Sequence, residues 1–141
     1  MKKLFPIIML LFSIVACDNY DNLRFPVSES ILEFINEEYR GATIRETEYT
    51  DNGLFEVEIR HDSHTKDVYF DKDDNWVYSS WDVRVSSLPA AVKSAVEAAY
   101  PGYRIDDADF IERPEGSYYR LEIEKGGIEK SLKITKNGES L

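Results

Sequence analysis

Tyr39-Arg40-Gly41-Ala42-Thr43-Ile44 recurs 61 positions later as Tyr100-Pro101-Gly102-Tyr103-Arg104-Ile105. A second stretch, Phe55-Glu56-Val57-Glu58-Ile59, recurs 64 positions later as Tyr119-Arg120-Leu121-Glu122-Ile123. Because the two offsets differ, one short insertion separates the copies. We expect it in the loop around Pro114-Glu115-Gly116, since loops tolerate added residues best. The sequence therefore predicts two tandem copies of one folded unit.

Each copy is predicted to begin with a helix that ends at a Tyr-x-Gly sequence. Ser28 is a favourable N-cap for the first helix, and Pro89 suits the first position of the second. Gly41 and Gly102 follow the two helices, where a residue in the left-handed conformation would end them. Apolar residues recur at helical spacing in both segments: Ile31, Phe34 and Ile35 in the first copy, and Val92, Ala95, Val96 and Ala99 in the second.

Strand signals follow each helix and are separated by turn sequences rich in Asp, Asn and Gly. They predict strands over residues 43–49, 54–60, 66–71 and 76–83 in the first copy, and over 103–111, 117–124 and 128–136 in the second. The fold class is therefore α+β, with two tandem α-β-β-β(-β) repeats and an antiparallel sheet covered by helices on one face. A fourth strand in the second copy, and a single sheet shared by both copies, stay open at this point.

Alternation along the predicted strands assigns two faces to the sheet. Phe55, Val57, Ile59, Val68 and Phe70 are expected to point toward the helix. The opposite face is predicted to display Tyr69, Trp76, Tyr78, Tyr118 and Arg120 among charged residues. Tyr, Trp and Arg are the residues enriched at binding hot spots, so this face is a candidate binding surface. The alternative is that strands simply favour aromatic residues, or that these side chains pack against residues 82–88 or against the other copy.

The N-terminus has the pattern of a secretory signal. Two lysines precede an apolar run of about 12 residues, which is too short to span a bilayer. Ile14-Val15-Ala16-Cys17 resembles the lipobox of bacterial lipoproteins, in which the cysteine is acylated and becomes the first residue. Lipidation also explains a lone cysteine in an exported chain. We therefore divide the chain into a signal peptide (1–16), a lipidated Cys17 with its tether (17–26), and two repeats (27–84 and 85–141).

Acidic residues dominate the predicted mature chain. Of 17 Lys and Arg, Lys2 and Lys3 leave with the signal, so 15 basic residues face 27 acidic ones, a balance of −12. This charge repels nucleic acid and anionic lipid head groups, so the only expected membrane contact is the lipid anchor. Asp18 after the cysteine resembles an inner-membrane retention signal in enterobacteria but a surface-export signal in Bacteroidetes. We favour the second reading, with the protein in the outer membrane on its periplasmic or surface side.

The ordered set of motifs resembles the PepSY-like, beta-lactamase-inhibitor-like family of exported proteins. The resemblance rests on the Tyr-x-Gly helix ends, the linker from Val85 to Val92, the strand Tyr118 to Ile123 and the hairpin Phe70 to Asn75, and it covers about residues 27–141. It implies tandem α+β units with helices on one sheet face. It does not imply inhibition of a beta-lactamase, because fold and function are separate properties.

Two groups of residues have the composition of ion sites. His61-Asp62-Ser63-His64 with Asp67 could hold a divalent metal, and Asp71-x-Asp73-x-Asn75 matches the start of a calcium loop. A solvated turn explains the histidines better, and Trp76 stands where a calcium loop requires glycine. We therefore predict no metal and no cofactor.

No nucleophile motif or phosphate-binding glycine loop is present in the sequence, so we predict that the protein is not an enzyme. The predicted function is that of a binding lipoprotein whose partner is a protein or peptide of the cell envelope, with inhibition as a special case. The alternative is a lipoprotein that senses a small molecule or a metal ion through its acidic loops.

Overall fold

The structure is a computed structural model, which describes residues 22–141. The predicted signal peptide, the predicted lipidation site Cys17 and the first part of the tether lie outside these residues. Within residues 22–141, no helix combines the length and the apolar character needed to cross a bilayer.

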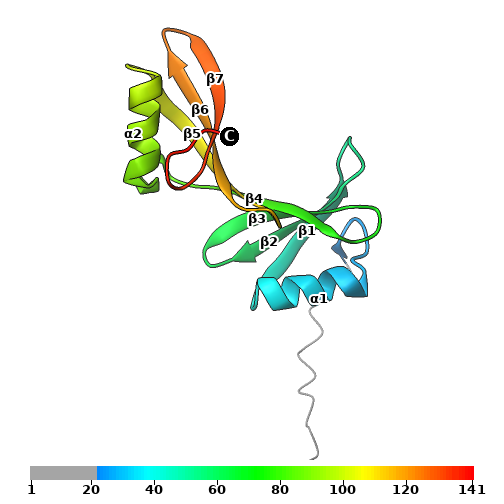
Figure 1. Ribbon diagram of the computed structural model, residues 1–141. Coiled ribbons are helices and arrows are strands. Elements are labelled where there is room, and N and C mark those ends of the chain that lie inside the picture. The colour runs from blue at the N-terminus through cyan, green and yellow to red at the C-terminus, as the bar shows by residue number, and fades with distance from the viewer. Residues whose placement is uncertain (1–21) are drawn as a thin grey trace, which may run out of the picture.

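A single seven-stranded antiparallel sheet carries two helices, and its strands are hydrogen-bonded in chain order. This confirms the predicted α+β class and shows that both halves of the chain share one sheet (Figure 1). The first half contains α1 (Glu29–Glu38), β1 (Thr43–Tyr49), β2 (Phe55–His61), β3 (His64–Phe70) and β4 (Trp76–Asp82); the second contains the short 3-10 turn η2 (Val85–Ser87), α2 (Ala90–Ala99), β5 (Arg104–Glu112), β6 (Tyr118–Lys125) and β7 (Ile128–Ile134).

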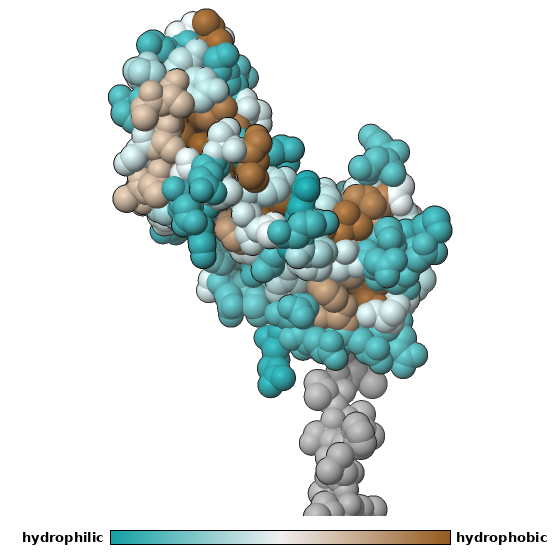
Figure 2. Space-filling model, in the orientation of Figure 1, coloured by the Kyte–Doolittle hydropathy of each residue, from teal (hydrophilic) through white to brown (hydrophobic). Residues whose placement is uncertain are grey.

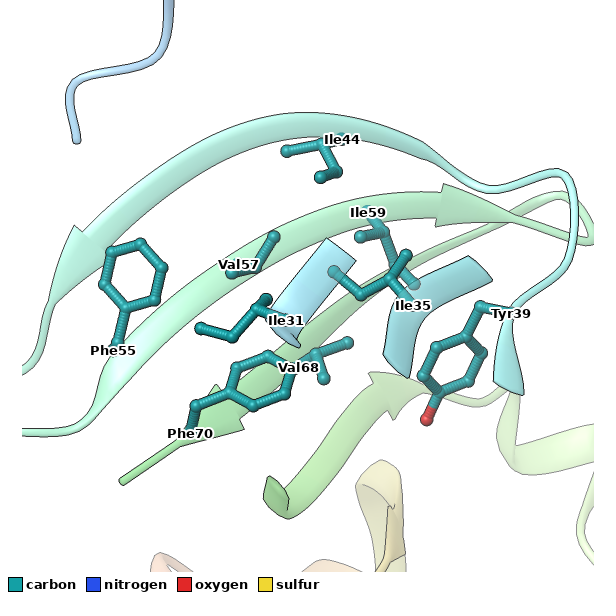
Figure 3. Close-up of a cluster of buried hydrophobic side chains, with 9 residues drawn as sticks. All are labelled: Ile31, Ile35, Tyr39, Ile44, Phe55, Val57, Ile59, Val68 and Phe70. Atoms are coloured by element: carbon teal, nitrogen blue, oxygen red, sulfur yellow. The ribbon is translucent and has the colours of Figure 1, made fainter. Parts of the chain in front are cut away.

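The core of the first half lies between α1 and β1 to β3. The Ile31 amide donates a hydrogen bond to Ser28 Oγ (3.3 Å), so Ser28 is the predicted N-cap. The helix is amphipathic, and its buried side chains Ile31 and Ile35 lie against the inward residues of the strands (Figure 3). Those residues are Ile44, Phe55, Val57, Ile59, Val68 and Phe70, and all are 9% exposed or less.

The second half repeats this arrangement with α2 on β5 to β7. Val92 and Val96 are buried against Ala108, Leu121, Ile123 and Ile134. Both helices end as predicted, with Gly41 (φ 82°) and Gly102 (φ 79°) in the left-handed region.

The strand register shows that both helices cover the same face of the sheet. One inward row crosses the chain from Val57 through Val68 and Ser79 to Glu112. Ala108 lies four residues before Glu112 on β5, and therefore on the same face. We call this the helix face and its reverse the open face.

The two halves meet along a short seam, where Ser79–Asp82 of β4 pairs with Asp109–Glu112 of β5. In Figure 1, β4 crosses the middle of the molecule and joins the two lobes. The sequence placed the insertion of the second copy in a loop, and this was wrong. The loops of residues 50–54 and 113–117 have equal length, so the extra residues lengthen the β5–β6 hairpin instead. Ile111 and Glu112, which pair with β4, lie in this lengthened part.

Tyr39, the C-cap residue of α1, ties the first helix to this seam. Its hydroxyl lies 2.7 Å from Ser79 Oγ and 3.0 Å from Glu112 Oε2, and it points away from the aliphatic cluster (Figure 3). Ser79 Oγ also accepts a hydrogen bond from Trp76 Nε1 (2.9 Å). Burial raises the pKa of Tyr39, so this hydroxyl stays a donor at neutral pH. One buried network thus joins α1, β4 and β5.

The end of the second half follows the first half only in part. Thr135 N donates to Glu139 O (2.9 Å), as Asp71 N donates to Asn75 O (2.9 Å) in the turn before β4. Ser140 then forms an isolated bridge with Ile134, at the place where Trp76 pairs with Phe70. Within residues 22–141 the second half therefore has three full strands, and β7 ends two residues earlier than predicted.

Replacing Tyr39 with Phe tests the network at the seam. The variant removes only the hydroxyl that faces Ser79 and Glu112, so we expect the free energy of unfolding to fall by about 1–2 kcal/mol, the usual cost of a lost buried hydrogen bond. Urea denaturation measures this loss. Tyr49→Phe is the matched control, because Tyr49 is 61% exposed. Equal losses in the two variants would contradict a stabilising role for the Tyr39 hydroxyl.

Candidate binding face

Three rows of side chains cross the open face, and each row is fixed by the register of neighbouring strands. In a sheet, directly opposed residues point to the same side, so each row is a line of neighbouring side chains. The first row is Glu48, Glu56, Tyr69 and Tyr78; the second is Glu46, Glu58, Asp67, Ser80, Ile111 and Tyr118; the third is Asp82, Asp109, Arg120 and Lys133. The second row crosses the seam, so the open face is continuous over both halves.

Tyrosines occupy the centre of the open face. The rings of Tyr69 and Tyr78 are stacked, with centroids 4.2 Å apart and planes at 21°. Both side chains are half-buried, and burial raises the pKa of each, so both hydroxyls stay protonated and can donate hydrogen bonds. Ile111, in the next row, is buried at 3% exposure. The centre therefore combines apolar surface with hydroxyl donors.

Tyr118 lies at the second-half side of this centre and is mostly covered. It is 7% exposed, its hydroxyl accepts a hydrogen bond from Arg113 Nη2 (3.2 Å), and the Arg113 guanidinium lies 5.3 Å from its ring centroid. The Lys133 ammonium lies 5.8 Å from the same ring. Tyr118 therefore packs beneath its neighbours and offers little exposed surface to a partner.

Carboxylates occupy the first-half side of the open face. Glu46, Glu48, Glu56, Glu58 and Asp67 are neighbours in the first two rows, and we call them the acidic half. Burial, followed by the charges of Glu56 and Glu58, raises the pKa of Asp67 to about 6. Burial also raises the pKa of Glu56, with the charges of Glu48 and Glu58 adding to it. These carboxylates are thus crowded and partly desolvated.

On the second-half side, Arg120 forms an ion pair within the face. Arg120 Nη2 lies 2.6 Å from Asp109 Oδ2, and this contact raises the pKa of the guanidinium. Asp82 is opposite Asp109, and a hydrogen bond between these carboxyls raises the pKa of Asp82. Beyond the third row, Asp107 faces Glu122 and Glu124 faces Glu129. The second-half side therefore mixes carboxylates with Arg104, Arg120 and Lys133, whereas the first-half residues of the first two rows include no basic residue.

Four of the five predicted binding residues lie on the open face, and one does not. Tyr69, Tyr78, Tyr118 and Arg120 are there. Trp76 was expected beside them but lies on the helix face, where its ring is 5.3 Å from that of Phe34. The cause is a register shift after Tyr69, which places Trp76 opposite Phe70. Such a bulge turns a side chain to the other face, and a strictly alternating sequence pattern does not show it.

Two charged residues on the helix face, the buried Lys66 and the partly buried Glu112, had no signal in the sequence pattern. Lys66 is 8% exposed, with its ammonium 4.1 Å from the Trp81 ring centroid and 5.1 Å from that of Tyr39. Burial lowers the pKa of Lys66. The Glu112 carboxylate accepts a hydrogen bond from the Tyr39 hydroxyl. Both lie near the seam, and only the pairing of β4 with β5 brings them together.

The Asp71 turn uses its own carboxylate internally. Asp71 Oδ1 accepts hydrogen bonds from the amides of Asp73 (2.8 Å) and Asn75 (2.9 Å). Hydrogen bonds from the Asn75 side chain, and then from these amides, lower the pKa of Asp71. Its second oxygen accepts from the Asn75 side chain (3.0 Å). This is an Asx turn, and it accounts for the acidic residues that resemble a calcium loop.

The histidine turn is likewise occupied by local contacts. The Nδ1 atom of His64 lies 2.9 Å from the carbonyl oxygen of Asp62, and the His61 ring packs at 5.5 Å against Tyr39. Across residues 22–141 no three His, Cys, Asp or Glu side chains are grouped so that they could share one metal ion.

Comparison with known proteins places this fold. A family model described as "Putative beta-lactamase-inhibitor-like, PepSY-like" matches residues 55–141. The chain belongs to this family. This confirms the resemblance found in the sequence. No curated protein matches the chain.

Solved structures of similar proteins come from Bacteroides. A BLIP-like protein from Bacteroides fragilis is 24% identical over 83% of this chain and 84% of its own, with a TM-score of 0.72. A protein from Bacteroides eggerthii, titled a putative periplasmic protein, is 20% identical over 83% and 87%, with a TM-score of 0.67. A DUF2874 family protein from Bacteroides ovatus is 19% identical over 83% and 86%, with a TM-score of 0.70. At these identities the likeness shows the fold alone.

Replacing Asp67 with Asn tests the crowding of the acidic half. The Asp67 carboxyl ionises near pH 6 in the folded chain and near its ordinary value when unfolded. Between these values the folded state binds more protons, so stability rises as pH falls from roughly 7 to 5. We expect Asp67→Asn to raise the melting temperature at neutral pH by roughly 2–4 °C and to flatten this rise, because the variant has no charge to lose.

Calorimetry across that pH range measures both effects. Glu33→Gln on the exposed side of α1 is the control, since it removes one charge away from the acidic half. An unchanged pH slope in Asp67→Asn would show that the pKa of Asp67 is not raised in the folded chain.

Proposed function

We propose that this protein is a non-catalytic binding module of the bacterial cell envelope, which presents its open sheet face to a protein or peptide. The observation that carries the proposal is the stacked pair Tyr69–Tyr78 at the centre of a face that neither helix covers. Aromatic side chains among polar neighbours are typical of interface hot spots. Stability comes from the helix face, so the open face is available for recognition.

The family and the fold support this proposal in a general way. PepSY-like, beta-lactamase-inhibitor-like proteins are described by likeness to an inhibitor, which is a binding protein without catalysis of its own. The B. eggerthii protein is titled periplasmic, which agrees with the secretory signal predicted for residues 1–16. We propose export with a lipid anchor at Cys17, in the outer membrane, and inhibition as one form that binding could take.

Site-specific photo-cross-linking in cells tests the proposal. A photoreactive phenylalanine analogue at Tyr78 places the reactive group on the open face and keeps an aromatic ring there. The same analogue at Tyr49 is the matched control, because Tyr49 is 61% exposed and contacts Phe25 and Phe55 on the helix face. We expect a discrete cross-linked species from position 78 and none from position 49.

Substituting the tyrosine pair completes the test. With the photoreactive group moved to Ser80, in the adjacent row, Tyr69→Ala with Tyr78→Ala is expected to abolish the cross-link while the melting curve stays cooperative. Cross-links of equal yield from positions 78 and 49, or from neither, would rule out the open face as the binding surface.

A further inference from the structure

We infer that the occupant of the open face is a cationic protein segment, which places an arginine or lysine side chain beside Tyr69 and against the acidic half. This inference rests on the proposed function and names the chemistry of its partner. It follows from the strand register, from the charges that the described chain leaves uncompensated, and from the position of the tyrosine pair.

The register places carboxylates directly opposite one another on three adjacent strands. Glu48 faces Glu56 across β1 and β2, and Glu46 faces Glu58, which in turn faces Asp67 on β3. Like charges in direct opposition destabilise a sheet. In most positions of a protein the residue type stabilises the fold, and exceptions are expected at functional surfaces. Several opposed carboxylate pairs side by side are such an exception.

The described chain does not neutralise these charges. The ion pairs within residues 22–141 use Asp62, Asp73, Asp106, Asp109 and Glu124, and none uses a member of the acidic half. Figure 2 shows hydrophilic residues over most of the visible surface of the lobe that carries α1, with a few hydrophobic residues between them. A positive side chain from outside would therefore relieve repulsion that folding alone leaves in place.

The tyrosine pair lies beside the acidic half, where its rings can contact a bound cation. Tyr69 is the next residue after Glu56 in the first row, so one side chain can reach the carboxylates and the ring together. Cations bind aromatic rings more strongly when they are partly desolvated. The chain uses this chemistry internally, with Lys66 over Trp81 and Arg113 over Tyr118.

Charge also separates this occupant from the other candidates. The predicted mature chain carries −12, so nucleic acid and anionic lipid surfaces are repelled. A second copy would have to bring a basic surface to the acidic half. Its Arg120 is already paired with Asp109, and its net charge adds to the repulsion. A cationic segment of another protein fits without this cost.

Two triple variants with the same charge change test the inference. Glu56→Gln, Glu58→Gln and Asp67→Asn remove three charges from the acidic half. Glu29→Gln, Glu33→Gln and Glu37→Gln remove three from exposed positions of α1. The probe is a blocked synthetic peptide of alternating arginine and tyrosine, with a glutamate and tyrosine peptide of equal length as the reverse-charge control. Calorimetry gives the affinities, and NMR maps the contact surface.

We expect the arginine peptide to bind the unchanged protein, with shifts centred on Glu56 and Tyr69, and the glutamate peptide not to bind. The acidic-half variant should bind the arginine peptide at least about 10-fold more weakly, and the α1 variant about as well as the unchanged protein. Equal weakening in both variants, or shifts spread over α1, would overturn the inference, because only the overall charge would then matter.

Experiments on the natural partner distinguish failure of this inference from failure of the proposed function. If the species cross-linked from position 78 is captured equally by the acidic-half variant, the open face binds a partner but the inference of a cationic one fails. If sedimentation of the unchanged protein shows a dimer that Tyr78→Ala dissociates, the occupant is a second copy and the inference also fails. Loss of the cross-linked partner in the acidic-half variant alone supports it.

Discussion

The structure depends on four residue pairs between β4 and β5, from Ser79–Glu112 to Asp82–Asp109. Each half has its own helix and its own aliphatic core, and these pairs turn two small units into one sheet. Backbone pairing over so short a length is weak alone. The buried hydroxyl of Tyr39 reinforces it, because one side chain from α1 reaches both Ser79 on β4 and Glu112 on β5. The orientation of the two halves thus rests on this short pairing together with the contacts across it, which are the Tyr39 hydroxyl and the packing of the Trp81 ring against Phe110 (4.9 Å between centroids).

The seam also determines what the open face can display. Because Ser80 pairs with Ile111, a row that starts at Glu46 on the first edge strand continues to Tyr118 on β6. Without the lengthened β5–β6 hairpin, Ile111 and Glu112 would have no place in the sheet. The difference between the two copies therefore supplies two of the four β5 residues that pair with β4, Ile111 and Glu112.

The sequence was sufficient to predict the features that depend on residues close together in the chain. The N-cap at Ser28, the left-handed glycines 41 and 102 and the alternating core residues of β2 and β6 are all present. Trp76 was misplaced because a bulge interrupts the alternation after Tyr69. The hairpin extension was misplaced because an offset between repeats gives the number of added residues but not their conformation. Lys66 and Glu112 could not be foreseen, since their neighbours come from strands far apart in the chain.

The sheet tolerates its acidic half because the buried core lies on the helix face and the carboxylates lie on the open face. Val57, Ile59, Val68 and Phe70 are fully buried on the helix face, directly behind the crowded carboxylates of β2 and β3. Their burial is the main source of stability in this half. These side chains alternate along each strand with those of the open face, so the two sets can differ independently. Repulsion on the open face therefore lowers stability without disturbing the core. In this architecture the open face can vary in charge while the fold is kept, which is the physical condition for one scaffold to present different binding surfaces.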